Sequence, residues 1–340
     1  MKEKVARRNF LKTSAIALGA AVGNLNTMAS AVSQDTVEQQ GKSLVFFTKE
    51  ISAESLLRIY GKVNSEIRGK IAIKLHSGEP HGANLLPIDL IKGLQRSISD
   101  STIVECNVLY QGPRQKTETH RETLKTNGFD FCAVDIMDED GDVPLAVPGM
   151  EAFLGERGAF APEHAYTPGW HLTEVSVGKN LLNYDSLVVY THFKGHPMGG
   201  FGGSLKNIAI GCASGKGGKL QIHGYGWPGG PLFMERMVEA RKAIASHFGK
   251  RITYINVLKN ISVDCDCLQN GAKPTCNDIG ILASTDILAI DKASVDLIYA
   301  QPDAQRHDIM HRIESRGGLH QIEYMRALQM GNDKYHLVNI

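Results

Sequence analysis

Residues 69–109 read GKIAIKLHSGEPHGANLLPIDLIKGLQRSISDSTIVECNVL, and this stretch decides the fold class. Residues 69–76 form a strand-like apolar run, and residues 87–98 carry apolar side chains at helical spacing with proline in the first turn. Residues 102–109 form a second apolar run, and the loop at residues 77–84 is polar and contains glycine. A strand, a helix and a strand in this order are typical of two parallel strands joined by a crossover helix.

The same alternation continues on both sides of this stretch. Strands are predicted at residues 43–48, 131–136, 172–177, 186–192, 254–258 and 287–290, and helices at about residues 52–64, 117–126, 232–248, 292–300, 304–315 and 319–330. We therefore expect an α/β fold over residues 43–340, as one domain or as two packed subdomains. Its mostly parallel sheet is flanked by helices, and its site loops lie at the C-terminal ends of the strands.

The N-terminus has the features of an export signal. Arg7 and Arg8 precede Asn9-Phe-Leu-Lys12, and the apolar stretch that follows, from about residue 16 to residue 22, is too short to span a membrane as a helix of roughly 20 residues. The order Arg-Arg-x-Phe-Leu-Lys resembles the twin-arginine signal of proteins that are exported already folded. The alternative is an ordinary secretory signal.

Small side chains at residues 29–31 offer a cleavage site after Ala31. We predict a signal peptide at residues 1–31, a polar linker at residues 32–42, and a periplasmic or extracytoplasmic product. No later segment is long and apolar enough to span a membrane, so we do not expect an integral membrane protein.

The charge balance argues against a nucleic-acid partner. The chain has 37 basic and 36 acidic residues, and removal of the five basic and one acidic residues of the leader leaves 32 and 35. A net charge near −3 gives no electrostatic footprint for nucleic acid. Hydrophobic residues make up 42% of the chain, which suffices for a core and excludes a disordered or fibrous class.

Residues 191–207, THFKGHPMGGFGGSLKN, follow a predicted strand and place four glycines within five residues. Ser204 is the expected N-cap of a short helix, so this loop would direct unpaired N–H groups and a positive dipole end at an anion. We predict that Gly200, Gly202, Gly203 and Lys206 bind a phosphate, a carboxylate or a cluster. The alternative is a tight turn under a packed helix.

The six cysteines are an even number, which can indicate disulfides in an exported protein. Cys265 and Cys267 stand in a Cys-x-Cys sequence, which does not easily bridge to itself but can present two thiolates to a soft metal. Cys276 and Cys212 are candidates for the third and fourth ligands. The alternative is a disulfide from Cys265 or Cys267 to Cys276, while the remaining two cysteines are expected in the core.

Histidines and an arginine on the same predicted rim complete the candidate site. His192 and His196 can bring two imidazoles to one metal, although a lone histidine is more often structural. Arg114 can bind a carboxylate or phosphate through two hydrogen bonds, and His76 and His120 can transfer protons. The alternative is that these are ordinary polar loop residues.

At these loops the sequence resembles a bacterial and archaeal family catalogued as domain of unknown function 362 and often labelled as iron–sulfur centre proteins. The matching stretches are residues 74–79, 107–114 with His120 and 127–129, 192–196, 200–207, 211–214, 264–267, 278–284 and Asp291. The resemblance implies a shared α/β core and an iron–sulfur centre. Many relatives carry a ferredoxin-like insertion, but residues 219–232 contain no cysteine here, so the chain is a variant without it.

These observations lead to one leading hypothesis and two alternatives. The first is an exported protein that depends on an iron–sulfur cluster or another metal, zinc being the alternative, and acts as a redox enzyme on a small anionic molecule. The second is a non-catalytic electron-transfer or metal-binding protein with a membrane-associated redox partner. The third is a metal-free hydrolase or ligand binder with disulfide-bonded cysteines.

Overall fold

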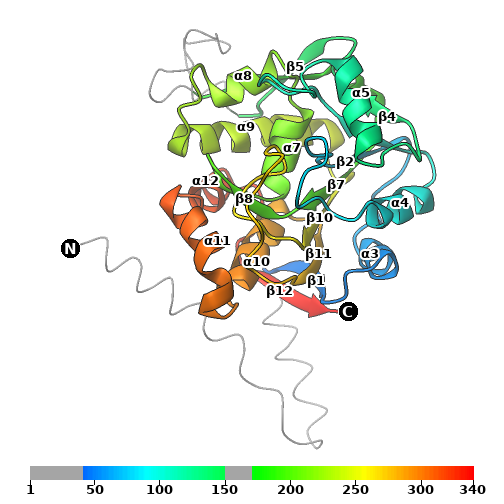
Figure 1. Ribbon diagram of the computed structural model, residues 1–340. Helices are drawn as coiled ribbons and strands as arrows, with labels where there is room; N and C mark the ends of the chain where they lie inside the picture. The colour runs from blue at the N-terminus through cyan, green and yellow to red at the C-terminus, as the bar shows by residue number, and fades with distance from the viewer. Residues whose placement is uncertain (1–40, 150–170) are drawn as a thin grey trace, which may run out of the picture. The chain divides into compact units, whose positions relative to one another are not determined.

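The computed structural model describes residues 41–149 and 171–340, of which residues 43–340 form one compact unit. Figure 1 shows this unit as a twisted sheet covered by helices. The predicted signal peptide and almost all of the predicted linker lie outside the described residues.

The main sheet has eight strands in the order β12-β1-β11-β10-β7-β2-β3-β4. Their bounds, in chain order, are β1 Ser43–Thr48, β2 Ile71–Lys74, β3 Ser101–Glu105, β4 Val134–Ile136, β7 Ser186–His192, β10 Ile252–Leu258, β11 Gly280–Ser284 and β12 Tyr335–Asn339. Only β11 is antiparallel to its neighbours, β1 and β10, while every other pairing is parallel. The expected α/β fold with a mostly parallel sheet is confirmed.

The described residues also form two two-stranded antiparallel sheets outside this one. One pairs β5 (Asp142–Ala146) with β6 (Glu174–Gly178), and the other is a tight hairpin of β8 (Lys194–His196) and β9 (Gly200–Gly202). The β8–β9 hairpin contains the glycine-rich segment that the sequence singled out.

Helices cover both faces of the sheet, because successive strand residues point to opposite sides. On β7, Leu187 and Val189 join one apolar core with α7 (Ser204–Cys212), α9 (Gly230–Phe248) and α10 (Ile287–Tyr299). Val188 and Tyr190 join the other core with α3 (Ala53–Tyr60), α4 (Ile88–Ser97) and α5 (Thr117–Thr126). The remaining helices are α8 Gly218–His223, α11 Asp303–Ser315, α12 His320–Ala327 and the 3-10 helix η3 Lys179–Asn183.

The strand predicted at residues 287–290 is wrong, because these residues begin α10. The Asp286 side chain accepts a hydrogen bond from the backbone N–H of Ala289 and so caps the helix. The strand lies instead at Gly280–Ser284, between β1 and β10. A short apolar run fits a buried strand and a buried helix equally well, and here the cap decides.

Candidate metal centre

The candidate site lies beyond the C-terminal ends of β2, β3, β7 and β10, where the chain leaves the sheet in polar loops. Residues 75–87 follow β2, residues 106–116 follow β3, the β8–β9 hairpin follows β7, and residues 259–279 follow β10. The predicted position of the site loops is therefore confirmed.

Asp266 anchors the loop that carries the two neighbouring cysteines. Its carboxylate lies 2.9 Å from His192 Nδ1 and 2.9 Å from Lys194 Nζ, and its backbone carbonyl accepts the N–H of Glu79. Although burial opposes the charge, His192 and Lys194 hold the pKa of Asp266 below its usual range. The N–H of Leu268 donates to the carbonyl of Cys265, so Asp266 and Cys267 lie in a turn that this anchor holds in place.

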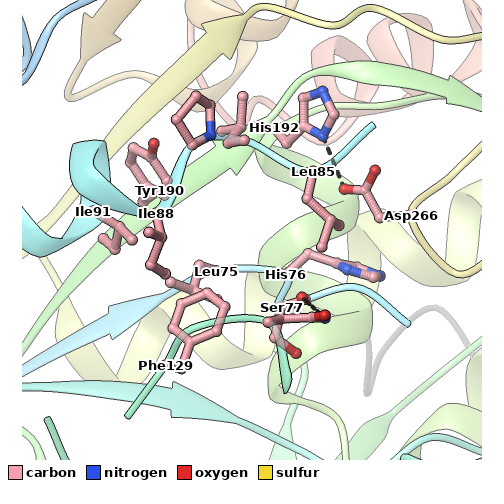
Figure 2. Close-up of a pocket in the computed structure, with 13 residues that line it drawn as sticks. Leu75, His76, Ser77, Leu85, Ile88, Ile91, Phe129, Tyr190, His192 and Asp266 are labelled. Carbon is pink, nitrogen blue, oxygen red and sulfur yellow. Dashed lines mark hydrogen bonds and ion pairs between the residues drawn. The ribbon is translucent and has the colours of Figure 1, made fainter. Parts of the chain in front are cut away.

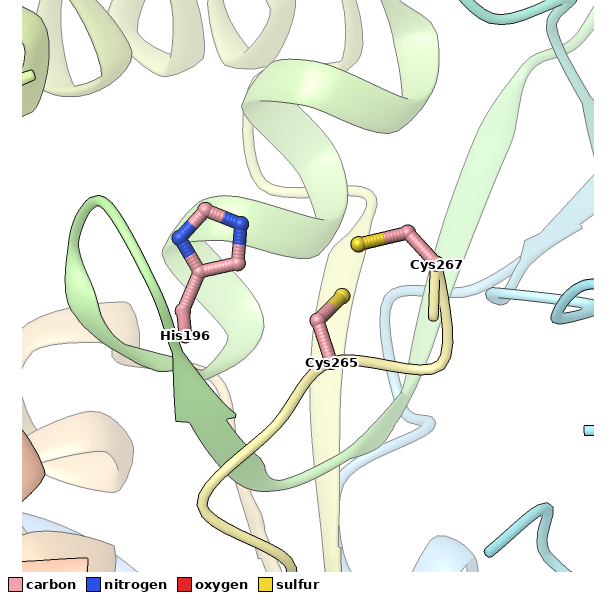
Figure 3. A group of neighbouring side chains, drawn as sticks. All are labelled: His196, Cys265 and Cys267. Atoms are coloured by element: carbon pink, nitrogen blue, oxygen red, sulfur yellow. The ribbon is translucent and has the colours of Figure 1, made fainter. Parts of the chain in front are cut away.

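His196 faces these cysteines from the β8–β9 hairpin (Figure 3). One ligand atom from each of His196, Cys265 and Cys267 lies within 4.8 Å of the others, so the three side chains can hold one metal ion. The hairpin approaches closely at Gly195, whose N–H donates 2.7 Å to the carbonyl of Ser262. An added Cβ at Gly195 would lie 2.2 Å from the carbonyl oxygen of Val263, so only glycine allows this approach.

Cys265 has the environment of a thiolate. The Lys206 ammonium lies 3.5 Å from Cys265 Sγ. A hydrogen bond from Cys267 is the largest influence that holds the pKa of Cys265 well below its usual range, with Lys206 and His76 acting in the same direction against burial. The same hydrogen bond and burial raise the pKa of Cys267. Of the two cysteines, Cys265 is therefore the one whose ionisation the surroundings favour.

His76 supports this thiolate from the loop after β2. The backbone N–H of Gly78 donates 3.0 Å to His76 Nδ1, so the proton of the neutral ring lies on the other nitrogen. Burial lowers the pKa of His76 to about 4, which keeps the ring neutral, and the ring forms a hydrogen bond with Cys265.

A cavity of about 140 Å³ adjoins the three candidate ligands, and His196 and Cys267 form part of its wall. Four basic side chains line it, namely those of Lys74, Arg114, Lys206 and Lys219, together with one carboxylate, that of Glu105. Much of the remaining wall is apolar. The cavity is small beside the roughly 300–1,000 Å³ sites that hold drug-sized ligands, so it fits a small molecule.

Three of the four basic groups already have an anionic partner. Lys74 Nζ lies 2.7 Å from Glu105, Arg114 Nε donates 2.8 Å to Glu79, and Lys206 contacts the Cys265 sulfur. Glu105 is fully desolvated, but the Lys74 ammonium above all holds its pKa below the usual range. Arg114, which was predicted to bind a carboxylate or phosphate ligand, thus forms an ion pair with Glu79 and also donates to Tyr110 Oη.

A second cavity, of about 40 Å³, lies on the other side of His76, between β7 and α4 (Figure 2). Leu75, Ile88 and Phe129 form part of its apolar wall. Its volume suits ordered water, which needs at least roughly 10–15 Å³, better than a substrate.

The glycine-rich segment is built differently from the prediction. The backbone N–H groups of Ser204 and Leu205 donate 2.8 and 2.9 Å to the carboxylate of Asp291. The expectation of unpaired N–H groups at this helix start is therefore wrong, because the anion there belongs to the chain itself. Gly203, not Ser204, is the N-cap, and an added Cβ at Gly203 would lie 2.5 Å from Asp291.

The other predicted cofactor-binding residues, Gly200, Gly202 and Lys206, do not share one environment. Gly200 has φ 77°, and a Cβ there would meet the backbone of Gly318 at 2.8 Å. Gly202 packs against the aliphatic part of Lys206. Of the four predicted cofactor-binding residues, only Lys206 lines the large cavity. Cofactor binding by the three glycines stays a prediction, whereas the expected meeting of Lys206 with the cysteine loop is observed.

Three predicted metal ligands do not join the group. Both ring nitrogens of His192 are engaged, one with Asp266 and the other with the carbonyl of Lys259. Cys212 ends α7 inside the apolar core, where burial raises its pKa to about 12. Burial likewise raises the pKa of Cys276 to about 11. None of the six cysteines is disulfide-bonded, so the alternative disulfide to Cys276 is not formed in this structure.

Of the predicted proton-transfer residues, His76 lines the large cavity and His120 does not. His120 is fully buried on α5, with Nδ1 3.3 Å from Asn107 and Nε2 without a hydrogen-bond partner among the described residues. Burial lowers its pKa to about 3. Sequence reasoning missed Lys74, Glu105 and Lys219 as site residues. A signal existed for the first two, because each is a charged residue at the end of an apolar strand.

A family model described as "Domain of unknown function (DUF362)" matches residues 71–296. Among solved structures, the lactate racemase apoprotein from Thermoanaerobacterium thermosaccharolyticum shares 12% identity at a TM-score of 0.37, with 76% of this chain and 58% of that chain covered. A protein from Thermotoga maritima shares 12% identity at a TM-score of 0.35, with 79% of this chain and 60% of that chain covered. The chain thus spans less than two thirds of either protein, and no curated protein matches it.

Among the described residues, no helix combines the length and apolar character needed to cross a membrane.

Proposed function

The chain belongs to the DUF362 family, and from that premise we propose that it is a metal-dependent enzyme acting on a small anionic molecule. The observation that carries the proposal is the convergence of His196, Cys265 and Cys267 within 4.8 Å beside a cavity with four basic side chains. A cavity next to the metal group favours catalysis over the alternative of simple metal storage or electron transfer. We assign His196, Cys265 and Cys267 as the ligands.

The donor set fits a single thiophilic ion. Two cysteines and one histidine are a ligand set that catalytic zinc uses, with the fourth position left for water or substrate. A four-cysteine cluster has less support, because Cys212 and Cys276 lie apart from the group. Such an ion, when bound, would supply Lewis-acid polarisation of a substrate oxygen. The redox reaction and the iron–sulfur centre expected from the sequence stay predictions.

The chain's own residues have to release protons for ligation, because ligands bind metals in deprotonated form. The surroundings favour ionisation of Cys265, whereas burial and the bond to Cys265 raise the pKa of Cys267. His196 Nδ1 accepts the backbone N–H of Gly199 at 3.0 Å, so the proton of its ring lies on Nε2. Ligation through Nδ1 displaces the bond to Gly199, and ligation through Nε2 requires the ring proton to move to Nδ1, which also ends that bond.

Elemental analysis of the full-length protein purified without oxygen tests the proposal. We expect about one metal ion per chain, lost in Cys265→Ser, Cys267→Ser and His196→Gln. Cys276→Ala is the matched control, since it removes a buried cysteine outside the group and should keep the metal. Metal that survives Cys267→Ser, or a protein that takes up neither zinc, iron, nickel nor cobalt, would contradict the proposal.

Export by the twin-arginine route is a separate proposal, supported by Arg7, Arg8 and the small residues before position 32. It predicts that Arg7→Lys with Arg8→Lys blocks processing in cells, whereas a change of both Lys2 and Lys4 to Gln does not. Processing at a normal rate in the double arginine variant would contradict it.

A further inference from the structure

Lys219 is a buried cation without an anionic partner among the described residues. Its side chain, on the first turn of α8, is only 4% exposed, and Nζ donates 2.6 Å to the carbonyl oxygen of Ala213. No carboxylate of residues 41–149 or 171–340 lies within ion-pair distance of it. Asp138 is a neighbour, but its two oxygens accept the backbone N–H groups of Asn107 and Gly215.

A buried charge without a partner is costly, so its presence in a cavity wall points to a ligand. Two of the other cations that line the large cavity form ion pairs, Lys74 with Glu105 and Arg114 with Glu79, and Lys206 contacts the Cys265 sulfur. Of the four cations, Lys219 is the one whose ammonium bonds only to a backbone carbonyl of the described residues.

The cavity extends along α7 between this lysine and the candidate metal ligands. Lys206, Asn207, Ile210 and Gly211 line it, and residues at this spacing share one face of a helix. Lys206 contacts Cys265 at one end of α7, and Lys219 bonds to Ala213 just past the other end. Seven residues of helix separate these two backbone positions, which is about 10 Å at a rise of ~1.5 Å per residue.

Much of the wall between the two ends is apolar, and Val108, Met198, Ile210 and Trp227 contribute to it. The paired side chains of Lys74 and Glu105 also line the cavity, with Lys74 against Gly211 of α7. One cation without a carboxylate partner suits a monoanion better than a phosphate dianion, and an apolar wall of this length suits a short hydrocarbon chain.

From the position of Lys219, which has no carboxylate partner among the described residues, and from the cavity along α7 we infer that the site binds a short-chain monocarboxylate, with its carboxylate on Lys219 and its other end toward His196 and Cys267. This inference deepens the proposed function, on which the assignment of the second end rests. Lys219 is then a substrate-binding residue, and the bound carboxylate provides the anion that its buried ammonium lacks.

Butyrate is the probe, with 1-butanol, n-butylammonium and inorganic phosphate as matched comparisons. The chain has two tryptophans, so full-length protein with Trp170→Phe reports binding through Trp227 at the cavity wall. We expect saturable binding of butyrate and weaker or no binding of the other three. Equal binding of the alcohol, preference for phosphate, or no binding of butyrate would overturn the inference.

Variants locate the carboxylate. Lys219→Met should weaken butyrate binding at least about tenfold, whereas Lys219→Arg keeps the charge and Lys216→Met removes an exposed lysine three residues away. Unchanged butyrate affinity in a folded Lys219→Met variant would overturn the assignment. If that variant does not fold, the comparison of the four probes on protein that retains Lys219 decides the question. Metal analysis of the same samples separates the two proposals. Butyrate binding without metal contradicts only the proposed function, and metal without butyrate binding contradicts only this inference.

Discussion

His192 Nδ1 lies 2.9 Å from the carboxylate of Asp266, the residue between Cys265 and Cys267. The histidine that sequence spacing suggested as a metal ligand thus holds the loop that carries the two thiols. Such a partner orients candidate ligands without touching the metal, and its loss typically costs 10–100-fold in metal affinity.

Asp266→Asn should therefore lower metal affinity about 10–100-fold and destabilise the fold. The amide keeps the shape but leaves Lys194 buried without its charge partner, and removal of one member of a buried pair costs about 3–5 kcal/mol. Metal titration and denaturant unfolding measure the two effects. Asp264→Asn, whose partner Arg312 is partly exposed, is the control and should cost under about 1 kcal/mol. Wild-type metal affinity in Asp266→Asn would show that the anchor is irrelevant to the thiols.

Glu105→Gln should destabilise the protein by about 3–5 kcal/mol, because it leaves the Lys74 ammonium buried without a counter-charge. The side chains of this pair are only 1% and 4% exposed. The surface pair of Arg121 with Glu139 provides the comparison, and Glu139→Gln should cost under about 1 kcal/mol. Urea unfolding of both variants checks the difference, and equal losses would mean that the buried pair contributes no more than the exposed one.

Much of the fold could be predicted from the sequence because apolar runs and helical spacing are local signals. The strand at residues 43–48 has the predicted bounds, and the helix predicted at residues 232–248 begins only two residues earlier. β12 was missed, because its partly exposed residues carry no clear apolar run. β11 was misplaced by a few residues, since the run from residue 279 to residue 290 contains both a strand and the start of α10.

The sequence predicted the site only in part, because the ends of parallel strands indicate which loops lie close together and nothing more. That rule brought Lys206, His76 and the cysteine loop to one edge of the sheet, and the structure shows them in contact. It could not give the direction of a side chain, so Cys212 and Cys276 were assigned to the metal although they point into the core. Nor could it reveal that Asp291, 87 residues beyond Ser204, would occupy the start of α7.

That carboxylate predicts a pH dependence of stability. Burial raises the pKa of Asp291 to about 6 in the folded protein, above the roughly 3.9 of an unfolded chain. The folded state therefore binds more protons between these values, and the stabilisation present at low pH is lost as pH rises through about 6. The loss amounts to about 2–3 kcal/mol between pH 4 and pH 7.

Asp291→Asn removes this titration, so its free energy of unfolding relative to wild type should rise by that amount over the same range. The variant also loses acceptor capacity for the N–H groups of Ser204 and Leu205, which lowers its stability at every pH without changing the slope. Asp303→Asn, an exposed carboxylate, serves as the control. Parallel pH profiles for wild type and Asp291→Asn would rule out Asp291 as the titrating group.

Gly195→Ala tests whether the close approach of two backbones positions the metal group. A Cβ at residue 195 would lie 2.2 Å from the carbonyl oxygen of Val263, and backbone atoms on both sides leave no flexible side chain to move aside. The β8–β9 hairpin has to withdraw, which carries His196 away from the cysteine loop. We expect a loss of about 1–3 kcal/mol in unfolding free energy, as for other overpacked sites, together with loss of metal. Gly61→Ala is the control, because an added Cβ there meets its nearest atom at an ordinary 3.5 Å and should leave metal content unchanged. A Gly195→Ala protein that keeps its full metal content would show that His196 reaches the thiols without this backbone contact, and the hairpin would then lose its role in the site.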